Sequence, residues 1–376
     1  MGRASWRWAV VAALVGLLLS LPGLAGLLPS DASSDLTAAQ LLERVRRGDR
    51  VAFSGYGEVR GDLDLPDIRE LRTLPATIGE TTRLRTWWRG PSQHRVDTLT
   101  LTGEVDVVTG TAPSGEDQRT TWDSERRRAT VLVGEQSVRL PVGADLLPNA
   151  LGARLARAEG VVPTLLHDQR VAGRPAAGLR LSPPDPTTTT VSHVDLWVEP
   201  GTGLPLRVEV HAAGAPRASI TSLLLDLDLT PPAAERTRFE IPRTARVSND
   251  RARDLAALAD RESPYQLPGS LAGLPRADRV EGLGGGVGTY GEGFTALTVV
   301  PLPPGTAADV ARRIARAQPS ALRTDGAVVV GTPLLQVLLA VRGGRGYLLA
   351  GSVPEPVLLR ALAALEADPP PLRAGA

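Results

Sequence analysis

The sequence predicts an α+β protein in which helices cover one antiparallel sheet, followed by a smaller C-terminal α/β sandwich and preceded by a transmembrane helix. Short runs with strand composition, separated by turn residues, fill most of residues 51–230. One segment with helical spacing precedes these runs and a second interrupts them, which is the pattern of helices segregated on one side of an antiparallel sheet. The 376 residues suffice for about two domains of roughly 100 to 200 residues each.

Residues 1–29 form the predicted membrane segment. Arg3 and Arg7 precede an apolar run from Trp8 to Leu28, and a helix of about 20 apolar residues spans the bilayer core. The two arginines indicate a cytoplasmic N-terminus, so the bulk of a single-pass membrane protein is expected outside the cytoplasm. A cleaved signal peptide is the alternative, because Pro22 could shorten the apolar core and residues 30–32 offer a weak cleavage site. The chain would then be secreted.

Residues 35–242 are expected to form the first domain. Asp35 is placed to cap a helix that runs through Arg47. Turn residues then separate strands expected at Val51–Arg60, Thr82–Trp88, His94–Thr102, Val105–Gly110, Thr120–Trp122 and Ala129–Gly134. The segment Asp145–Ala158 has leucines at helical spacing, so we expect this helix to pack across a face of the sheet.

The segment from His193 to Val210 predicts a β-hairpin. Two alternating runs flank a Glu-Pro-Gly-Thr-Gly turn. Leu206, Val208 and Val210 share one face and polar residues the other, so one face is expected to be buried and the other hydrated. The strand expected next, Ile220–Thr230, has a largely acidic face and an apolar face formed by Leu223, Leu225, Leu227 and Leu229.

Residues 243–278 are expected to form a linker with one short helix, Arg251–Asp260. Residues 279–376 are expected to form the α/β domain, of about 100 residues. Its first strand is expected at Phe294–Leu302, followed by a helix capped by Thr306. The remaining strands and the terminal helix are expected at Val328–Val330, Leu334–Val341, Tyr347–Val353 and Pro356–Glu366.

The composition excludes several classes of function. The net charge is only +1 and no basic cluster dominates, so no nucleic-acid partner is expected. The chain has no cysteine, which removes disulfides, thiolate metal sites, thiol nucleophiles and a lipobox for lipid attachment.

The motifs that could carry chemistry have simpler interpretations. Gly286 to Gly291 matches Gly-x-Gly-x-x-Gly, but a strand and not a helix is expected after it, so a dinucleotide site is not predicted. The four histidines are scattered without metal-ligand spacing, although His193 and Asp195 would share one face of a strand. The acidic residues of 62–67 fit a solvated turn better than a calcium loop. We therefore expect no metal, no cofactor and no enzymatic activity, since no nucleophile, base and orienting group can be assembled.

The hairpin also carries a resemblance to a known family. Leu196-Trp-Val-Glu-Pro followed by Gly201-Thr-Gly-Leu-Pro-Leu-Arg207 resembles the strand-turn-strand of the LolA-like lipoprotein-binding proteins and their MucB/RseB branch. The likeness extends from Asp35 to Phe239-Glu-Ile-Pro242. The second domain resembles that of the MucB/RseB branch at Leu267 to Pro275 and at Tyr290-Gly-Glu-Gly-Phe294. The resemblance implies an antiparallel half-barrel closed by helices, with a cavity for acyl chains. The likeness to the MucB/RseB branch also implies a regulatory role, because proteins of that branch sense the state of the envelope and restrain the cleavage of a membrane anti-sigma factor.

Two functional hypotheses follow, beside the simpler interpretation that the apolar residues only form a core. In the first, a non-enzymatic extracytoplasmic carrier or sensor holds a lipid or lipoprotein acyl chain in an apolar cavity. In the second, a regulator binds a membrane protein such as an anti-sigma factor without a ligand. In either case the C-terminal domain would contact a partner at the membrane. The residues expected to line the cavity are Trp88, Leu99, Leu101, Trp122, Leu147, Leu151, Leu196, Val198, Leu206, Val208, Leu223, Leu225 and Leu227.

Overall fold

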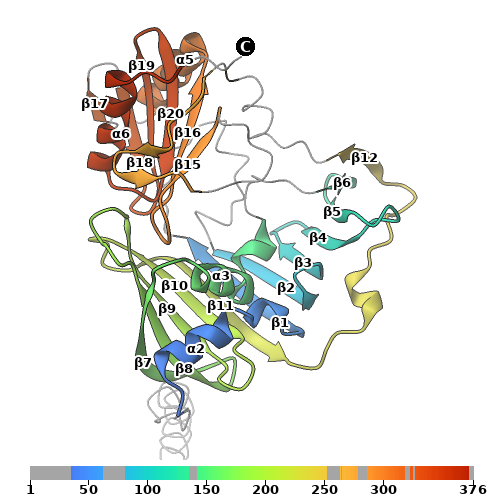
Figure 1. Ribbon diagram of the computed structural model, residues 1–376. Coiled ribbons are helices and arrows are strands. Elements are labelled where there is room, and N and C mark those ends of the chain that lie inside the picture. The colour runs from blue at the N-terminus through green and yellow to red at the C-terminus, as the bar shows by residue number, and fades with distance from the viewer. Residues whose placement is uncertain are drawn as a thin grey trace, which may run out of the picture.

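The computed structural model describes residues 35–61, 81–134, 142–251, 263, 265–277, 286–317, 322–324 and 327–371. Figure 1 shows two units, a large sheet in the N-terminal part of the chain and a smaller sheet in the C-terminal part. The large sheet has 12 strands and the smaller one has 6. The described chain is therefore mostly β-sheet with few helices, and its large sheet is open and mixed.

The large sheet has the strand order β12-β6-β5-β4-β3-β2-β1-β11-β10-β9-β8-β7. Its neighbours are antiparallel except β12 and β6, which are parallel. The strands are β1 (Phe53–Gly61), β2 (Thr81–Gly90), β3 (Gln93–Leu99), β4 (Glu104–Thr111), β5 (Asp117–Asp123), β6 (Arg128–Val133), β7 (Val162–Val171), β8 (Arg174–Ser182), β9 (Val191–Val198), β10 (Pro205–Ala212), β11 (Ala218–Asp228) and β12 (Arg246–Arg251).

The first helix, α2 (Ala38–Val45), begins at a capping box. The Thr37 hydroxyl accepts a hydrogen bond from the Gln40 backbone amide at 3.3 Å, and the Gln40 side chain accepts one from the Thr37 amide at 2.9 Å. Two orphan amides of the first turn are thereby satisfied. The predicted cap at Asp35 is wrong, because Thr37 has the Gln three residues later that completes the box. A short 3₁₀ helix, η1 (Gly48–Arg50), follows.

The predicted helix Asp145–Ala158 consists of two pieces. A 3₁₀ turn, η3 (Gly143–Leu146), is followed by α3 (Pro148–Ala156). Pro148 starts α3 because proline is well suited to the first helical position, where its missing amide costs nothing. Figure 1 shows α2 and α3 against one face of the large sheet, which we call the helix face. The opposite face is called the outer face.

The protein's own side chains fill the space beneath α2 and α3. Leu41 and Val45 of α2 are fully buried and pack in one cluster with Leu196 and Val208 of the hairpin. A second cluster joins the fully buried Leu147 to the strands beside α3. These contacts explain why the apolar face of the hairpin points toward the helices.

A β-bulge changes the expected faces of β11. The pairing of β11 with β1 shifts between Tyr56 and Gly57, so that Leu225 is the extra residue. A bulge of one residue reverses the alternation that follows it. Leu224 is therefore buried and Leu225 is 47% exposed, and the single apolar face predicted for the odd-numbered leucines from 223 to 229 is wrong.

Three strands of the large sheet were not expected from the sequence. The composition of β8 counts against strand formation, because the strand contains Pro175, Gly178 and other small residues. Its partner β7 was not recognised either. Gly178 is required there, because a Cβ at this position would lie 2.5 Å from the carbonyl oxygen of His167. The third strand, β12, pairs with β6 inside the segment expected to be a linker. The short helix expected over Arg251–Asp260 lies, beyond Arg251, outside the described residues.

The smaller sheet lies between two helices. Its strands, in the order β15-β16-β20-β19-β18-β17, are antiparallel. Val328, Val330 and Leu339 pack against α5, whereas Ala327, Val329, Leu338 and Ala340 share a cluster with α6. The elements are β15 (Gly288–Tyr290), β16 (Leu297–Leu302), α5 (Pro304–Ala317), β17 (Leu322–Thr324), β18 (Ala327–Gly331), β19 (Gln336–Arg342), β20 (Arg345–Gly351) and α6 (Glu355–Ala367), preceded by a hairpin of β13 (Ser270–Leu271) and β14 (Leu274–Pro275). The helix begins at Pro304, so the predicted cap at Thr306 is wrong.

The loop between β8 and β9 contacts the C-terminal unit. The Thr190 amide donates to the Ser352 carbonyl at 2.9 Å and its hydroxyl donates to the Leu334 carbonyl at 2.6 Å. The Thr189 hydroxyl donates to the Phe294 carbonyl at 2.9 Å. Phe294 and Leu334 also pack in the cluster beneath α2. The threonines of this loop therefore join the two units.

Among the described residues, none of the helices has both the length and the apolar character needed to cross a bilayer. The membrane segment expected at residues 1–29 lies outside the described residues, as does the acidic stretch 62–67.

Candidate functional site

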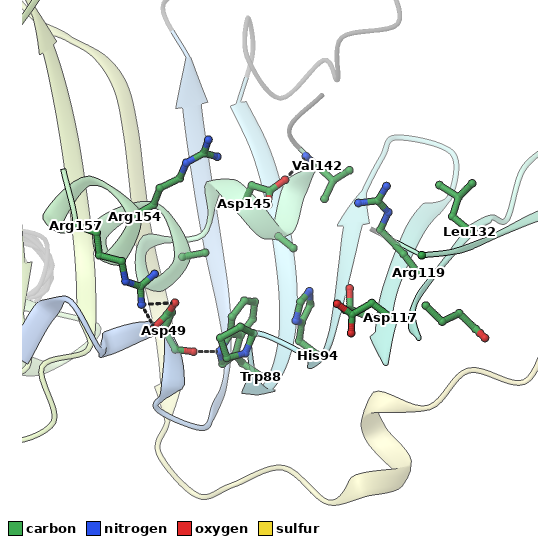
Figure 2. Close-up of a pocket in the computed structure, with 16 residues that line it drawn as sticks. Asp49, Trp88, His94, Asp117, Arg119, Leu132, Val142, Asp145, Arg154 and Arg157 are labelled. Atoms are coloured by element: carbon green, nitrogen blue, oxygen red, sulfur yellow. Dashed lines mark hydrogen bonds and ion pairs between the residues drawn. The ribbon is translucent and has the colours of Figure 1, made fainter. Parts of the chain in front are cut away.

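A cavity of about 400 Å³ lies on the helix face, between α3 and the strands β2 to β6. This volume is within the range of ligand pockets, about 300 to 1,000 Å³. Figure 2 shows the helix residues on one side of the cavity and the strand residues on the other. It is lined by Asp49, Trp88, Pro91, His94, Thr109, Asp117, Gln118, Arg119, Leu132, Gly134, Val142, Ala144, Asp145, Ala150, Arg154 and Arg157.

One row of cross-strand neighbours forms the sheet side of the cavity. Trp88 pairs with His94, His94 with Thr109, Thr109 with Arg119, and Arg119 with Leu132. Directly paired residues point to the same face of a sheet, so these five side chains stand side by side on five strands. The row was missed by sequence reasoning because its members are spread over more than 40 positions and only the strand register brings them together.

Trp88 is held rigidly at one end of this row. Its indole Nε1 donates to the carbonyl oxygen of Asp49 at 2.6 Å, and its ring stacks on His94 at 4.2 Å between centroids. The imidazole Nδ1 of His94 lies 3.2 Å from the Gly90 carbonyl oxygen. An indole fixed on both its polar and its apolar side presents a preorganised edge to the cavity.

The helix side of the cavity is ionic. Arg157, at the end of α3, pairs with Asp49 at 2.7 Å and so ties α3 to η1. The Asp145 carboxylate accepts a hydrogen bond from the Val142 amide at 2.7 Å, which closes the turn of η3. Arg154 makes no ion pair with any residue that the structure describes, and Figure 2 shows it extended beside the cavity.

The lining contains three carboxylates and three guanidinium groups. Such a wall can pair with ionic and hydrogen-bonding groups of a ligand, and arginine suits carboxylate recognition because its donors form a planar fork. Among the described lining residues no nucleophile is paired with a base and an orienting group in the manner of a catalytic site. The arrangement is suited to binding.

A second group of charges lies on the outer face of the same strands. Asp97 and Asp106 are buried, and Arg95 pairs with them at 2.7 and 2.9 Å. Burial and the nearby Asp97 carboxylate raise the pKa of Asp106 to about 7. Arg85 also pairs with Asp97, at 3.0 Å. The group is therefore an ion-pair network of two guanidinium groups and two buried carboxylates.

The predicted cavity residues are dispersed in the structure. Of the thirteen, Trp88 alone lines the cavity. Leu99, Trp122 and Leu223 lie on the outer face. Each is paired across the strands with a residue whose side chain points to that face, and the Trp122 ring packs on Phe239. Leu101 and Leu225 are exposed. Leu151 packs at the edge of the core and the others are buried in it, namely Leu147, Leu196, Val198, Leu206, Val208 and Leu227.

No protein-family model matches the chain, and no curated protein matches it. Solved structures do match. The Pseudomonas aeruginosa MucA/MucB complex is 19% identical with a TM-score of 0.48, over 86% of this chain and 96% of that chain. An uncharacterized conserved protein from Thermus thermophilus is 12% identical with a TM-score of 0.35, over 57% and 99%. A LolA superfamily protein from Nitrosomonas europaea is 16% identical with a TM-score of 0.21, over 51% and 92%. Two of these matches, the MucA/MucB complex and the LolA superfamily protein, belong to the groups named in the predicted LolA-like, MucB-like fold.

Proposed function

We propose that the chain is a non-enzymatic extracytoplasmic binding protein and that its cavity holds a polar segment of a membrane-protein partner. The observation that carries this proposal is the lining of the cavity, which includes three carboxylates, three guanidinium groups and the Trp88 indole. A polypeptide segment offers charges, amides and single apolar side chains, which are the groups that such a lining accepts.

The charged lining favours this partner over a hydrocarbon chain. An acyl chain laid against Arg154 and Asp117 would remove their water without replacing its hydrogen bonds, which is costly for charged groups. The apolar space expected beneath α2 and α3 is filled by fully buried residues such as Leu196 and Leu206. A guest there would have to displace the protein's own core.

Arg154 is the residue best placed to select the partner. It makes no ion pair with a described residue, so a carboxylate of the partner would be its counter-ion. Arg157 is already paired with Asp49. The cavity therefore accepts a partner segment in which an acidic side chain stands next to an apolar one. The acidic side chain would pair with Arg154, and the apolar one would lie against Trp88.

A lipid or lipoprotein moiety is the second candidate. The same lining includes the apolar residues Leu132, Val142, Ala144 and Ala150. A short apolar part could contact these residues while an anionic headgroup paired with Arg154. The predicted N-terminal membrane segment would hold the protein close to either kind of ligand.

Photo-crosslinking in native membranes separates the two. A photoreactive amino acid replaces Leu132 in the cavity, and the matched control replaces Leu165, which is 53% exposed on β7. The proposal predicts a polypeptide adduct from position 132 that Arg154→Glu weakens, whereas a lipid-sized mass increase would favour the second candidate. Equal adducts from both positions, insensitive to Arg154→Glu, would refute a role for the cavity.

A further inference from the structure

Two histidines and two carboxylates meet on the outer face of the β9-β10 hairpin. His193 pairs with His211 across the strands, and Asp195 pairs with Glu209. These residues alternate with Val194 and other buried residues of the helix face, so their side chains point the opposite way. The sequence places His193 and His211 far apart, and only the hairpin register brings the two rings together.

The donor atoms have the spacing of ligands around one ion. The imidazole rings stack at 4.3 Å between centroids with 13° between their planes. The Nε2 atoms of His193 and His211 lie 3.8 and 4.0 Å from Asp195 Oδ2, and His211 Nε2 lies 3.4 Å from Glu209 Oε2. Two ligands at about 2.1 Å from a tetrahedral zinc ion are about 3.4 Å apart. Shifts of about half an ångström would bring these atoms to that spacing.

Neighbouring groups prepare the histidines for this role. The Nδ1 of His193 lies 3.0 Å from the Ser192 hydroxyl, which leaves Nε2 to face the cluster. The histidine side chains are 21% and 20% exposed, so an ion can reach them from solvent.

We propose that His193, His211 and Asp195, with Glu209 beside them, bind a divalent transition-metal ion, with Zn²⁺ the best match. Two imidazoles and a carboxylate suit zinc, whereas Mg²⁺ and Ca²⁺ prefer oxygen ligands. Solvent on the open side leaves a position for water or for a donor from another molecule. The ion would join β9 to β10 and would add an exposed coordination site to the outer face.

Arg180 is the competitor for this site. Its guanidinium donates to both carboxylate oxygens of Asp195 at 2.7 Å. Oδ2 retains a second lone pair for a metal, but the positive charge of Arg180 opposes a dication. Removal of this charge should therefore tighten metal binding, which is the opposite of what damage to the fold would do.

The test measures Zn²⁺ binding to the full, tag-free chain by isothermal titration calorimetry with excess Mg²⁺ present. The proposal predicts one ion per chain. Because loss of even an outer partner of a metal ligand typically weakens affinity by about 10- to 100-fold, His193→Gln and His211→Gln should each weaken binding by at least about tenfold. Arg180→Gln should strengthen it.

His167→Gln is the matched control, because this exposed histidine lies on β7 outside the cluster. It should leave the affinity unchanged, and circular dichroism confirms that every variant is folded. The proposal is overturned if the native chain shows no stoichiometric binding, or if His193→Gln and His167→Gln have the same effect.

Discussion

The buried carboxylate of Asp106 makes a specific prediction about stability and pH. Asp106 is 1% exposed and its Oδ1 has no hydrogen-bond partner among the described residues. Burial, and then the charge of Asp97, raise its pKa from 3.8 to about 7. Asp106→Asn keeps the shape of the side chain and removes its ionisation. We expect this substitution to stabilise the protein at pH 8 more than at pH 5.

The sign and size follow from proton linkage. Between pH 5 and 7 the folded protein keeps a proton on Asp106 that the unfolded chain has released, so the folded state binds more protons and its stability falls as the pH rises. The slope is at most about 1.36 kcal/mol per pH unit, or about 2 to 3 kcal/mol over this interval. Above pH 7 the carboxyl ionises in both states and the contribution becomes constant. Asp106→Asn should remove this part of the pH dependence.

Urea unfolding at pH 5, 6, 7 and 8, followed by tryptophan fluorescence, measures this effect. Trp6 and Trp8 belong to the predicted membrane segment and the other four tryptophans lie between residues 87 and 197, so a change of the signal on unfolding of the large sheet comes from the first domain. Asp185→Asn is the control, because hydrogen bonds from Thr187 lower the pKa of that carboxyl and its titration ends below this range. If the free energies of unfolding of Asp106→Asn and of the native chain differed by the same amount from pH 5 to 8, the reasoning would be refuted.

Three further predictions concern the core, the hairpin turn and the junction of the two units. Leu196→Ala should lower the free energy of unfolding by about 2 to 5 kcal/mol, because this side chain is fully buried, whereas Leu101→Ala at an exposed position should change it by less than about 0.5 kcal/mol. The same urea curves measure both, and similar effects would contradict the placement of these leucines. Gly203→Ala should cost at least about 1 kcal/mol, because its φ is +78° and a Cβ would lie 2.6 Å from the Arg44 carbonyl oxygen. An unchanged unfolding midpoint would count against this contact. Thr190→Val should remove a side-chain hydrogen bond to the C-terminal unit and speed limited proteolysis between the units, and an unaltered rate of cleavage would argue that this bond does not hold them together.

The hairpin shows what sequence reasoning can predict. The alternation of Leu206, Val208 and Val210 with charged residues indicated both strands, and in the structure these three side chains are buried beneath the helices. Strong alternation around a turn rich in glycine and proline is local information. Elements defined in this way were predicted close to their observed bounds.

Features that depend on register were not predictable in the same way. The exposed position of Leu225 follows from one extra residue in β11 opposite β1, and no local pattern marks this bulge. The pairing of His193 with His211 and the row that begins at Trp88 likewise depend on which strands are neighbours. One property of a sheet accounts for these misses: a shift of one residue moves every side chain to the other face.

The proposed function gives the two halves of the helix face different tasks, stability for one and recognition for the other. Beneath α2 and α3 the sheet is covered by aliphatic side chains such as Leu196, and burial of such residues stabilises the fold without leaving room for a guest. Beside α3 the same face carries Asp117 and Arg119, and Arg154 of α3 lies on the other side of the cavity. Charges at a binding surface set specificity and the rate of association more than they set affinity. A partner that uses this cavity should therefore associate more slowly as ionic strength rises, since salt screens exposed charges over about 10 Å at 0.1 M. A ligand bound through hydrocarbon alone would not show this dependence, so the salt dependence of association distinguishes the two kinds of ligand without knowledge of their identity.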